Sequence, residues 1–250
     1  MLGLGVGFYK VGGDTYPSGT WTPRSLGGDL MIHLKFKQGI DEVAANDDSG
    51  TERARQVAQW SDFSGKGNHA QPTASDDAEE MPTYQTDGSV LFDNALNSLV
   101  FGSALNLAAF AIYWRANWSN TINNDVPFEG NSTADFIKLA SPTQIRIKIG
   151  GATREDATID EITDDGTTYH NIGVERESNG NLFCSLDGAE GEFSQVSPKD
   201  GNTDIGTQFA LTQIGDGTQN SKWIEVIIVG RALTAAERVH MNNYLNSIVI

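Results

Sequence analysis

Residues 60–70 decide the fold of this chain, and they read Trp60-Ser-Asp-Phe-Ser-Gly-Lys-Gly-Asn-His-Ala70. An apolar anchor is followed by residues that favour turns for different physical reasons. Asp62 and Asn68 can hydrogen-bond to their own backbone, and Gly65 and Gly67 can take positive φ without strain. The stretch predicts the end of one strand, a turn and re-entry into a sheet. Asp62, Asn68 and His69 could face a ligand, but in turns of this kind such side chains more commonly hydrogen-bond to the backbone and fix the turn.

Short strands separated by Gly, Asn and Asp turns extend outward from this turn. The period of two is clearest at Asp29–Phe36, where Leu30, Ile32 and Leu34 share one face. The spacing is typical of an antiparallel sandwich, because no strand–helix alternation is present. Further strands are predicted at Val57–Trp60, Ser89–Asp93, Ser98–Phe101, Phe110–Trp114, Asp135–Leu139, Gln144–Ile149, Thr168–Glu175, Leu182–Leu186, Gln208–Thr212 and Trp223–Val229.

One helix is predicted, at the C-terminal end. Thr234-Ala-Ala-Glu237 is a capping box, in which the threonine oxygen and the glutamate satisfy free amides of the first turn. Apolar residues follow at mostly helical spacing, so the helix should pack on the sandwich. Two other segments are predicted to be irregular: 14–28 as an extended linker around Trp21, and 38–55 as an acidic loop.

The length of 250 residues and the apolar content of 38% allow one large core. We predict a single β domain over 29–250, preceded by an arm and linker over 1–28. No run of 18 apolar residues exists, so membrane insertion is not expected. The first residues lack the features of a secretory signal, so export by that route is not expected.

The N-terminal arm alternates apolar residues with glycine. Such a segment has the strand period, but its glycines leave one face without side chains and weaken it on its own. We therefore expect the arm to lie against another surface, which is either its own domain or a neighbouring subunit. Its apolar positions are Leu2, Leu4, Val6 and Phe8.

The formal charge of −16 argues against nucleic-acid binding, which needs clustered lysine and arginine. Solubility and self-repulsion are the simplest consequences of this charge. The lone Cys184 excludes an intrachain disulfide and a multi-thiolate metal site, and we expect it to be a small core residue.

Three features in order resemble one family. They are the turn at 60–70, the Pro82-x-Tyr84 to Val90-x-Phe92-Asp93 continuation, and the strand at 224–228 that leads into the helix. Together they resemble a laminin-G-like member of the concanavalin A-like lectin/glucanase superfamily, of the kind found in bacteriophage virion proteins. The resemblance implies an all-β fold, a two-sheet antiparallel jelly-roll sandwich with one C-terminal helix and an extended N-terminal arm.

One departure from the family concerns the first strand. Many relatives end it with a Trp-Leu-Asp-Ala type sequence, whereas this chain has His33-Leu-Lys-Phe36. A ligand or ion site that depends on that strand end in relatives is therefore not carried over. Retaining glucanases of the superfamily also carry Glu-x-Asp-x-x-Glu, and residues 154–162 do not keep that spacing. We expect these carboxylates to face solvent and the protein not to be an enzyme.

The loop at 117–125 combines an indole with amides, a composition suited to stacking on a sugar and hydrogen-bonding to it. The same composition also suits an ordinary surface loop. The glycan-binding candidates are Trp118, Asn123, Asn124 and Asp125.

Metal and cofactor binding rest on paired acidic and amide residues in loops. No cofactor is expected. Calcium is the one alternative that these loops leave open, because calcium is bound by several oxygen ligands of the kind that Asp and Asn supply. None of the pairs has EF-hand spacing, so no metal ligand is assigned. The pairs are Asp47–Asp48, Asp76–Asp77, Asp93–Asn94 and Asp164–Asp165.

Two functions remain open from the sequence. The first is a non-enzymatic structural protein on the surface of a phage particle, as head decoration, neck or tail-fibre component, whose arm and jelly roll contact other virion proteins or copies of itself. The second is a lectin or host-adhesion module that binds a surface glycan, with or without calcium. A glycoside hydrolase is disfavoured by the missing carboxylate motif.

Overall fold

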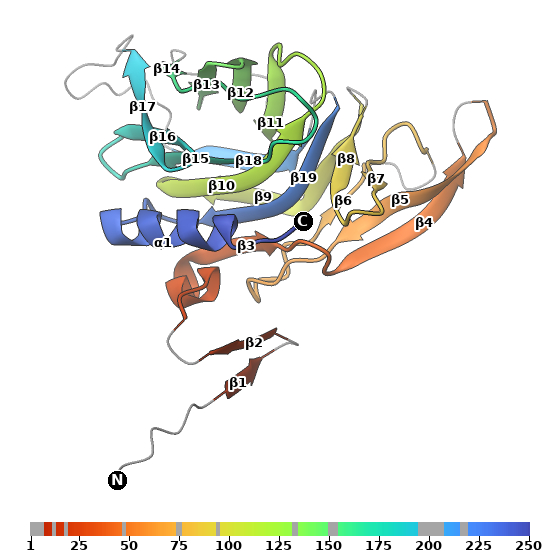
Figure 1. The fold of residues 1–250 in the computed structure, drawn as a ribbon, viewed down its shortest axis with the longest axis horizontal. Coiled ribbons are helices and arrows are strands. Elements are labelled where there is room, and N and C mark those ends of the chain that lie inside the picture. Colours follow the sequence, from red (N-terminus) through yellow and green to blue (C-terminus); the bar gives the residue numbers. More distant parts are fainter. Residues whose placement is uncertain are drawn as a thin grey trace.

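A computed structural model describes residues 8–11, 14–17, 20–46, 49–73, 77–93, 96–131, 135–149, 155–194, 208–215 and 220–250. These residues form nineteen strands, one 3-10 helix and one C-terminal α-helix, which confirms the all-β class. Two layers of antiparallel strands lie face to face (Figure 1). Strands rather than helices form because apolar residues alternate with polar ones between Gly, Asn and Asp turns.

The first layer, called here the helix-side sheet, has the strand order β3, β19, β10, β15, β16. β19 and β10 lie in its middle and are apolar on both faces, because one face meets the core and the other meets a helix. The bounds are β3 Leu30–Leu34, β19 Ser221–Val229, β10 Phe110–Trp118, β15 His170–Arg176 and β16 Leu182–Leu186.

The second layer has the order β6, β9, β18, β11, β12, β13, β14. β17 pairs with both β14 and β16 and joins the two layers along one side, while β5, β7 and β8 join them along the other. The bounds are β5 Glu52–Trp60, β6 Ala70–Gln71, β7 Thr83–Tyr84, β8 Val90–Phe92, β9 Leu99–Leu107, β11 Asp125–Gly130, β12 Phe136–Ser141, β13 Gln144–Lys148, β14 Glu155–Thr158, β17 Ala189–Ser194 and β18 Phe209–Ile214.

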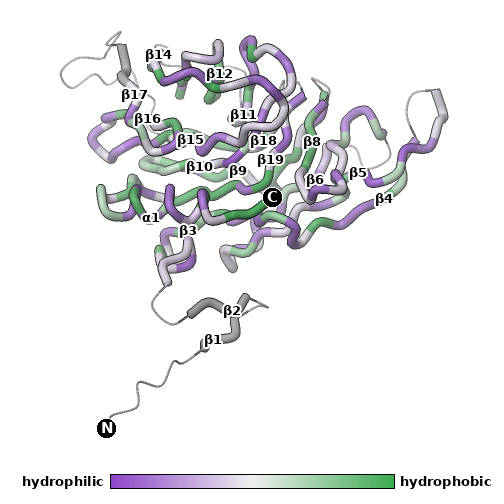
Figure 2. The backbone as a smooth tube through the Cα atoms, viewed as in Figure 1, coloured by the Kyte–Doolittle hydropathy of each residue, from purple (hydrophilic) through white to green (hydrophobic). Residues whose placement is uncertain are grey.

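The main core fills the space between the two layers. Its centre is aromatic: the ring of Trp114 on β10 lies 4.9 Å from that of Phe128 on β11, and Phe128 lies 5.7 Å from Trp223 on β19. Figure 2 shows hydrophobic residues following β8, β10 and β19 through this region. Cys184 is buried among these residues, as predicted, and burial raises the pKa of its thiol to about 12.

A second, smaller core lies on the other face of the helix-side sheet. There α1 (Ala235–Asn246) and the 3-10 helix η1 (Pro23–Asp29) cover apolar side chains of β10 and β19. Figure 1 shows α1 running along this face. The predicted capping box is confirmed, because the Glu237 N–H donates to Thr234 Oγ1 while the Thr234 N–H donates to the Glu237 carboxylate.

The 60–70 turn covers the outer edge of β3. Asp62 Oδ1 accepts the N–H of His33 over 2.9 Å, and the Asn68 side chain donates to the Met31 carbonyl over 2.9 Å. Gly65 and Gly67 take the predicted positive φ, at 88° and 75°. The side chains of the turn therefore fix the backbone, as predicted, and also saturate an edge that would otherwise offer free hydrogen-bonding groups.

Two segments differ from the sequence-based expectation. Residues 38–55 are not a loop, because β4 (Ile40–Asn46) pairs with β5 and forms a hairpin that projects from the sandwich (Figure 1). Part of the 14–28 linker is η1, because Leu26 is buried in the smaller core and holds the segment against the sheet. The acidic composition of 38–55 and the Gly and Pro content of 14–28 both favour irregular structure, so neither element was predicted.

The arm is described only in part. Leu2, Leu4 and Val6 lie outside the described residues, and Phe8 begins β1 (Phe8–Val11). β1 pairs with β2 (Asp14–Pro17) as a separate two-stranded sheet (Figure 1). No helix in the described part of the chain is long and apolar enough to cross a membrane.

Candidate functional site

The predicted glycan-binding residues do not form one site. Trp118 is completely buried in the main core, so the expectation that its indole offers a sugar platform is wrong. β10 continues through Trp118 in the same inward phase as Trp114, which places both indoles between the layers. Asp125 is buried at the start of β11, whereas Asn123 and Asn124 are exposed and remain candidates.

The carboxylates at 155–161 separate in the structure. Glu155 is buried at the start of β14, not solvent-facing as expected, and burial raises its pKa to about 7. Asp156, on the opposite face, pairs with Arg146 over 2.8 Å, and Asp160 and Glu161 are exposed. These groups do not make the paired carboxylates of a retaining glycosidase.

The described residues offer no cluster of side chains for a metal ion. Within the described residues, no group of three His, Cys, Asp or Glu side chains could hold an ion. Of the acidic pairs, Asp47–Asp48, Asp76 and Asn94 lie outside the described residues. Asp165 is committed to its own turn, because the N–H groups of Thr167 and Thr168 donate to it and hold the pKa of that carboxyl well below its usual range.

His170 and Asp187 form a histidine–aspartate pair of the kind that can act as a general base, but the second ring nitrogen of His170 is not free to do so. His170 Nδ1 lies 2.7 Å from Asp187 Oδ2, while Nε2 accepts the backbone N–H of Thr163 over 3.0 Å. The nitrogen that would have to take a proton is therefore occupied by a backbone donor. This pair fixes the loop that precedes β15.

A hollow, called here the helix pocket, lies between α1, the end of β3 and the residues that precede η1. Its volume is about 460 Å³. Three distant parts of the sequence meet there because α1 and η1 pack side by side on the helix-side sheet. The pocket is lined by Thr20, Trp21, Lys35, Phe36, Gln38, Glu225, His240, Asn243, Tyr244, Ser247 and Ile248.

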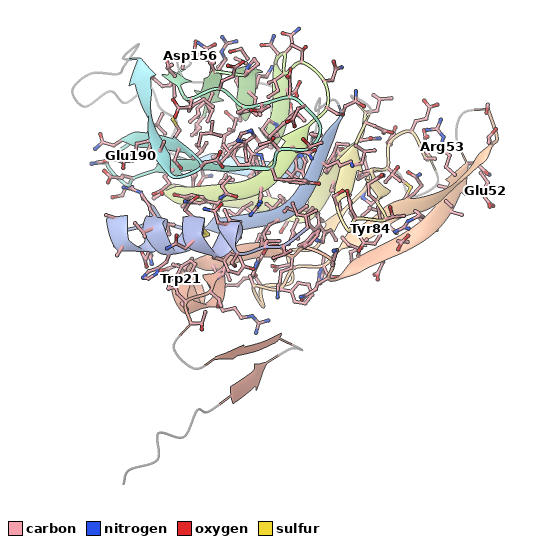
Figure 3. The ribbon with its side chains drawn as sticks, in the orientation of Figure 1. Trp21, Glu52, Arg53, Tyr84, Asp156 and Glu190 are labelled. Atoms are coloured by element: carbon pink, nitrogen blue, oxygen red, sulfur yellow. The ribbon has the colours of Figure 1, made fainter. Side chains whose placement is uncertain are left out.

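Aromatic rings form one wall of the helix pocket. Trp21 is half-buried and stacks on His240, with ring centres 5.6 Å apart and planes inclined by 15°. Tyr244 meets Trp21 edge-on, at 6.5 Å. Figure 3 shows Trp21 next to α1, at the start of η1. A wall of this kind offers apolar ring surface at low conformational cost.

The floor of the helix pocket is the carboxylate of Glu225, both of whose oxygens accept hydrogen bonds from the protein. Glu225 is only 1% exposed, and its Oε1 accepts from His33 Nε2 over 2.6 Å and from the Tyr244 hydroxyl over 2.7 Å. Its Oε2 accepts the Phe36 N–H over 2.8 Å. Three donors on two segments, the β3 segment and α1, hold this carboxylate in place, and the carboxylate in turn positions Tyr244.

Hydrogen bonds and ion pairs hold α1, and with it the aromatic wall, against the helix-side sheet. Glu175 on β15 accepts from Arg238 over 2.9 Å and from Tyr113 over 2.5 Å. At the start of the helix, Arg231 bridges Asp29 and Glu237, and its bonds to Glu237 lower the pKa of that carboxyl to about 2. The wall is therefore preorganised by contacts along the whole helix.

Sequence reasoning missed the residues of the helix pocket. Trp21 lies in a Gly/Pro/Ser-rich segment that favours a linker, and Tyr244 follows the helical spacing expected for packing. The one available signal was a lone indole in an otherwise polar linker, which indicates a docking contact. Lys35 and Phe36 belong to the strand end that departs from the family pattern, so the departure falls at the pocket itself.

Comparisons of sequence give no relative: no family model matches the chain, and no curated protein matches it. Comparisons of structure find several solved proteins with a similar fold. The binding domain of paraclostridial mosquitocidal protein 1 superposes with a TM-score of 0.57 at 12% identity, over 89% of this chain and 53% of that one.

Two other solved structures have a similar core. One is botulinum neurotoxin type C, whose cell entry is described as dependent on two ganglioside molecules, with a TM-score of 0.55, 11% identity and 90% of this chain covered. The other is Trypanosoma rangeli sialidase in complex with sialic acid, with a TM-score of 0.55, 12% identity and 88% covered. This chain spans 53% and 33% of their lengths. At these identities the likeness shows the fold alone, a lectin-like β-sandwich of jelly-roll type.

Proposed function

We propose that this protein is a glycan-binding module that holds a sugar in the helix pocket, and that it belongs to the laminin-G-like branch of the concanavalin A-like superfamily. The observation that carries the proposal is the aromatic wall of Trp21 and Tyr244 above the buried Glu225. Sugars present apolar ring faces and hydroxyl groups, which match a pocket of apolar surface with a few fixed polar groups. Fold neighbours described with ganglioside or sialic acid support this class of ligand.

Binding without catalysis is part of the proposal. Among the described residues that line the helix pocket, Glu225 is the one carboxylate, and double displacement needs two. Glu225 is also occupied by three donors. An activity screen on the ligand, with Glu225→Gln as a variant, should show no turnover in either protein.

The test of the binding site is a glycan array on the full chain, followed by calorimetry with the best glycan. Trp21→Ala should weaken binding at least tenfold, because the ring platform is lost. Asn243→Ala should weaken it two- to fivefold without loss of stability, since Asn243 is exposed on α1 and alanine favours a helix. Running the array with and without a chelator decides whether calcium takes part.

The matched control is Tyr84→Ala. Tyr84 is a half-exposed aromatic residue on β7, stacked under Arg55 at 5.1 Å and on another part of the molecule (Figure 3). It should leave the affinity unchanged. Equal losses in Trp21→Ala and Tyr84→Ala, or no glycan bound by the natural chain, would contradict the proposal.

A second candidate function is a structural role on the surface of a phage particle, made in the host cytoplasm and assembled through the arm and the jelly roll. The favouring observation is the separate β1–β2 sheet, because an isolated two-stranded hairpin is marginally stable in water and gains stability from another surface. Deletion of residues 1–13 should abolish incorporation into particles, while glycan binding stays intact. Unchanged incorporation would contradict this role.

A further inference from the structure

A second hollow, called here the arginine hollow, lies between η1 and the 60–70 turn. Its volume is about 260 Å³, and it is lined by Arg24, Gly27, Leu30, Phe63, Ser64 and Gly65. It combines one cation with one aromatic ring and an exposed glycine backbone. Gly27 and Gly65 both take positive φ, and a Cβ at either position would meet nothing within 4 Å, so the backbone here is open to an approaching group.

The linings of the two hollows meet at one contact, between Lys35 and Phe63. Phe63 lines the arginine hollow, and the ammonium group of Lys35, which lines the helix pocket, lies 5.5 Å from the centre of the Phe63 ring. Leu30 and Lys35 are five residues apart on the β3 segment, which corresponds to about 16 Å of extended chain. A ligand longer than a single sugar can therefore occupy both hollows.

Exposed cations lie close to the arginine hollow in a chain that is acidic as a whole. The chain carries a formal charge of −16, yet Arg24, Lys37 and Lys66 are exposed and make no ion pair with any residue that the structure describes. Arg24 lines the arginine hollow and Lys66 follows Gly65 of its lining, whereas the stem of Lys37 lies against Gly88. Unpaired cations at a concave site favour an anionic ligand.

Two nearby carboxylates, Asp29 and Asp62, make no ion pair with these cations, because each has other partners. Asp29 pairs with Arg231 over 2.7 Å. Both oxygens of Asp62 accept hydrogen bonds, from Ser64 and Asn68 within the turn and from the His33 N–H on β3. The exposed cations are left as the groups that an incoming ligand would meet.

We propose that the ligand of the helix pocket is an acidic oligosaccharide, whose neutral end lies against Trp21 and whose anionic group binds Arg24 in the arginine hollow. This inference rests on the proposed glycan-binding function and names the class of glycan. A guanidinium group holds a carboxylate or a sulfate through two parallel hydrogen bonds. Lys66, exposed beside Gly65, adds long-range attraction.

The experiment compares matched neutral and anionic sugars on the full chain. An array that pairs each neutral glycan with its sialylated, uronate-bearing and sulfated counterparts ranks the anions, and calorimetry with lactose, 3′-sialyllactose and 3′-sulfolactose separates a carboxylate from a sulfate. Within pairs, the anionic sugar should bind about tenfold more tightly, the factor of one charge-assisted contact.

Arg24→Gln should remove this preference and leave binding of the neutral sugar unchanged. Lys138→Gln is the matched control, because Lys138 lies on β12 outside both hollows and should change nothing. Equal binding of neutral and anionic sugars, or equal loss in both variants, overturns the inference while the glycan-binding function stands. A natural chain that binds neither kind of sugar overturns both.

Discussion

The backbone N–H of His33 donates to Asp62 Oδ1 over 2.9 Å, and this bond joins the free edge of β3 to the 60–70 turn. The same carboxylate accepts the N–H of Asn68 over 3.0 Å and the N–H of Ser64 over 2.8 Å. One side chain thus fixes its own turn and closes an edge of the sheet. Because β3 also ends at the helix pocket, Asp62 supports the candidate site by holding the backbone of β3 in place.

Asp62→Ala should lower the free energy of unfolding by about 3 kcal/mol, since buried donors lose a charged acceptor. Urea unfolding followed by tryptophan fluorescence measures the change. Asp41→Ala, at an exposed position of β4, is the matched control and should stay within about 0.5 kcal/mol of the natural chain. Similar losses in the two variants would show that the turn does not cap the edge.

Glu175→Ala should destabilise the protein by about 3 kcal/mol, because Arg238, Tyr113 and the Leu233 N–H all lose their common acceptor. The helix α1 should loosen before the sandwich does. Hydrogen exchange checks this: protection in α1 should fall while protection in β10 is kept. Uniform loss of protection would contradict a local role for this carboxylate.

The pH dependence of stability should carry a contribution from Glu155. Its pKa is about 7 in the folded chain, above the ordinary value of 4.5, because burial disfavours the charged form. The folded state therefore binds the proton more tightly, and the stability that this provides is present below pH 4.5 and is lost as the pH rises to 7.

Glu155→Gln isolates this contribution. The variant should be more stable than the natural chain at pH 8, by about 2 to 3 kcal/mol, and the two should converge near pH 4.5. Urea midpoints of both proteins across this range give the difference. A gap that does not change with pH would show that Glu155 is ionised in the folded state.

Cys184 should not react with a thiol reagent in the native protein at pH 8. Its side chain is 3% exposed and its pKa is about 12, so the thiolate is both rare and inaccessible. Labelling should become rapid in denaturant, and its rate under native conditions should follow global unfolding. Fast labelling of the folded chain would contradict a core position.

The local elements of this fold are largely predictable from the sequence. The strand at Leu30–Leu34, the turn at 60–70 and the capping box at Thr234 each depend on residues close together in the chain, and the structure confirms these elements. The physical reason is that side-chain alternation, positive-φ glycines and capping hydrogen bonds act over a few residues. The expected single apolar face of the strand is wrong for Leu30, which packs in the smaller core while Ile32 and Leu34 pack in the main core.

The candidate site could not be predicted in the same way. Trp118 and Trp21 both stand in polar surroundings in the sequence, yet one is buried between the layers and the other lines a pocket. Glu155 and Glu161 have similar neighbours in the chain, yet only Glu155 is buried. Burial depends on which element packs over a residue, and composition does not contain that information.

By itself, the sequence determined the jelly-roll class, the turn that covers the edge of β3 and the helix that closes the chain. Only the tertiary structure decided which indole is buried and which is available. It alone brought Trp21, Glu225 and Tyr244 together with Arg24 nearby, because α1 and η1 dock on the same face of the helix-side sheet. Docking follows from matching apolar surfaces far apart in the chain, so the site exists only once the sandwich has formed.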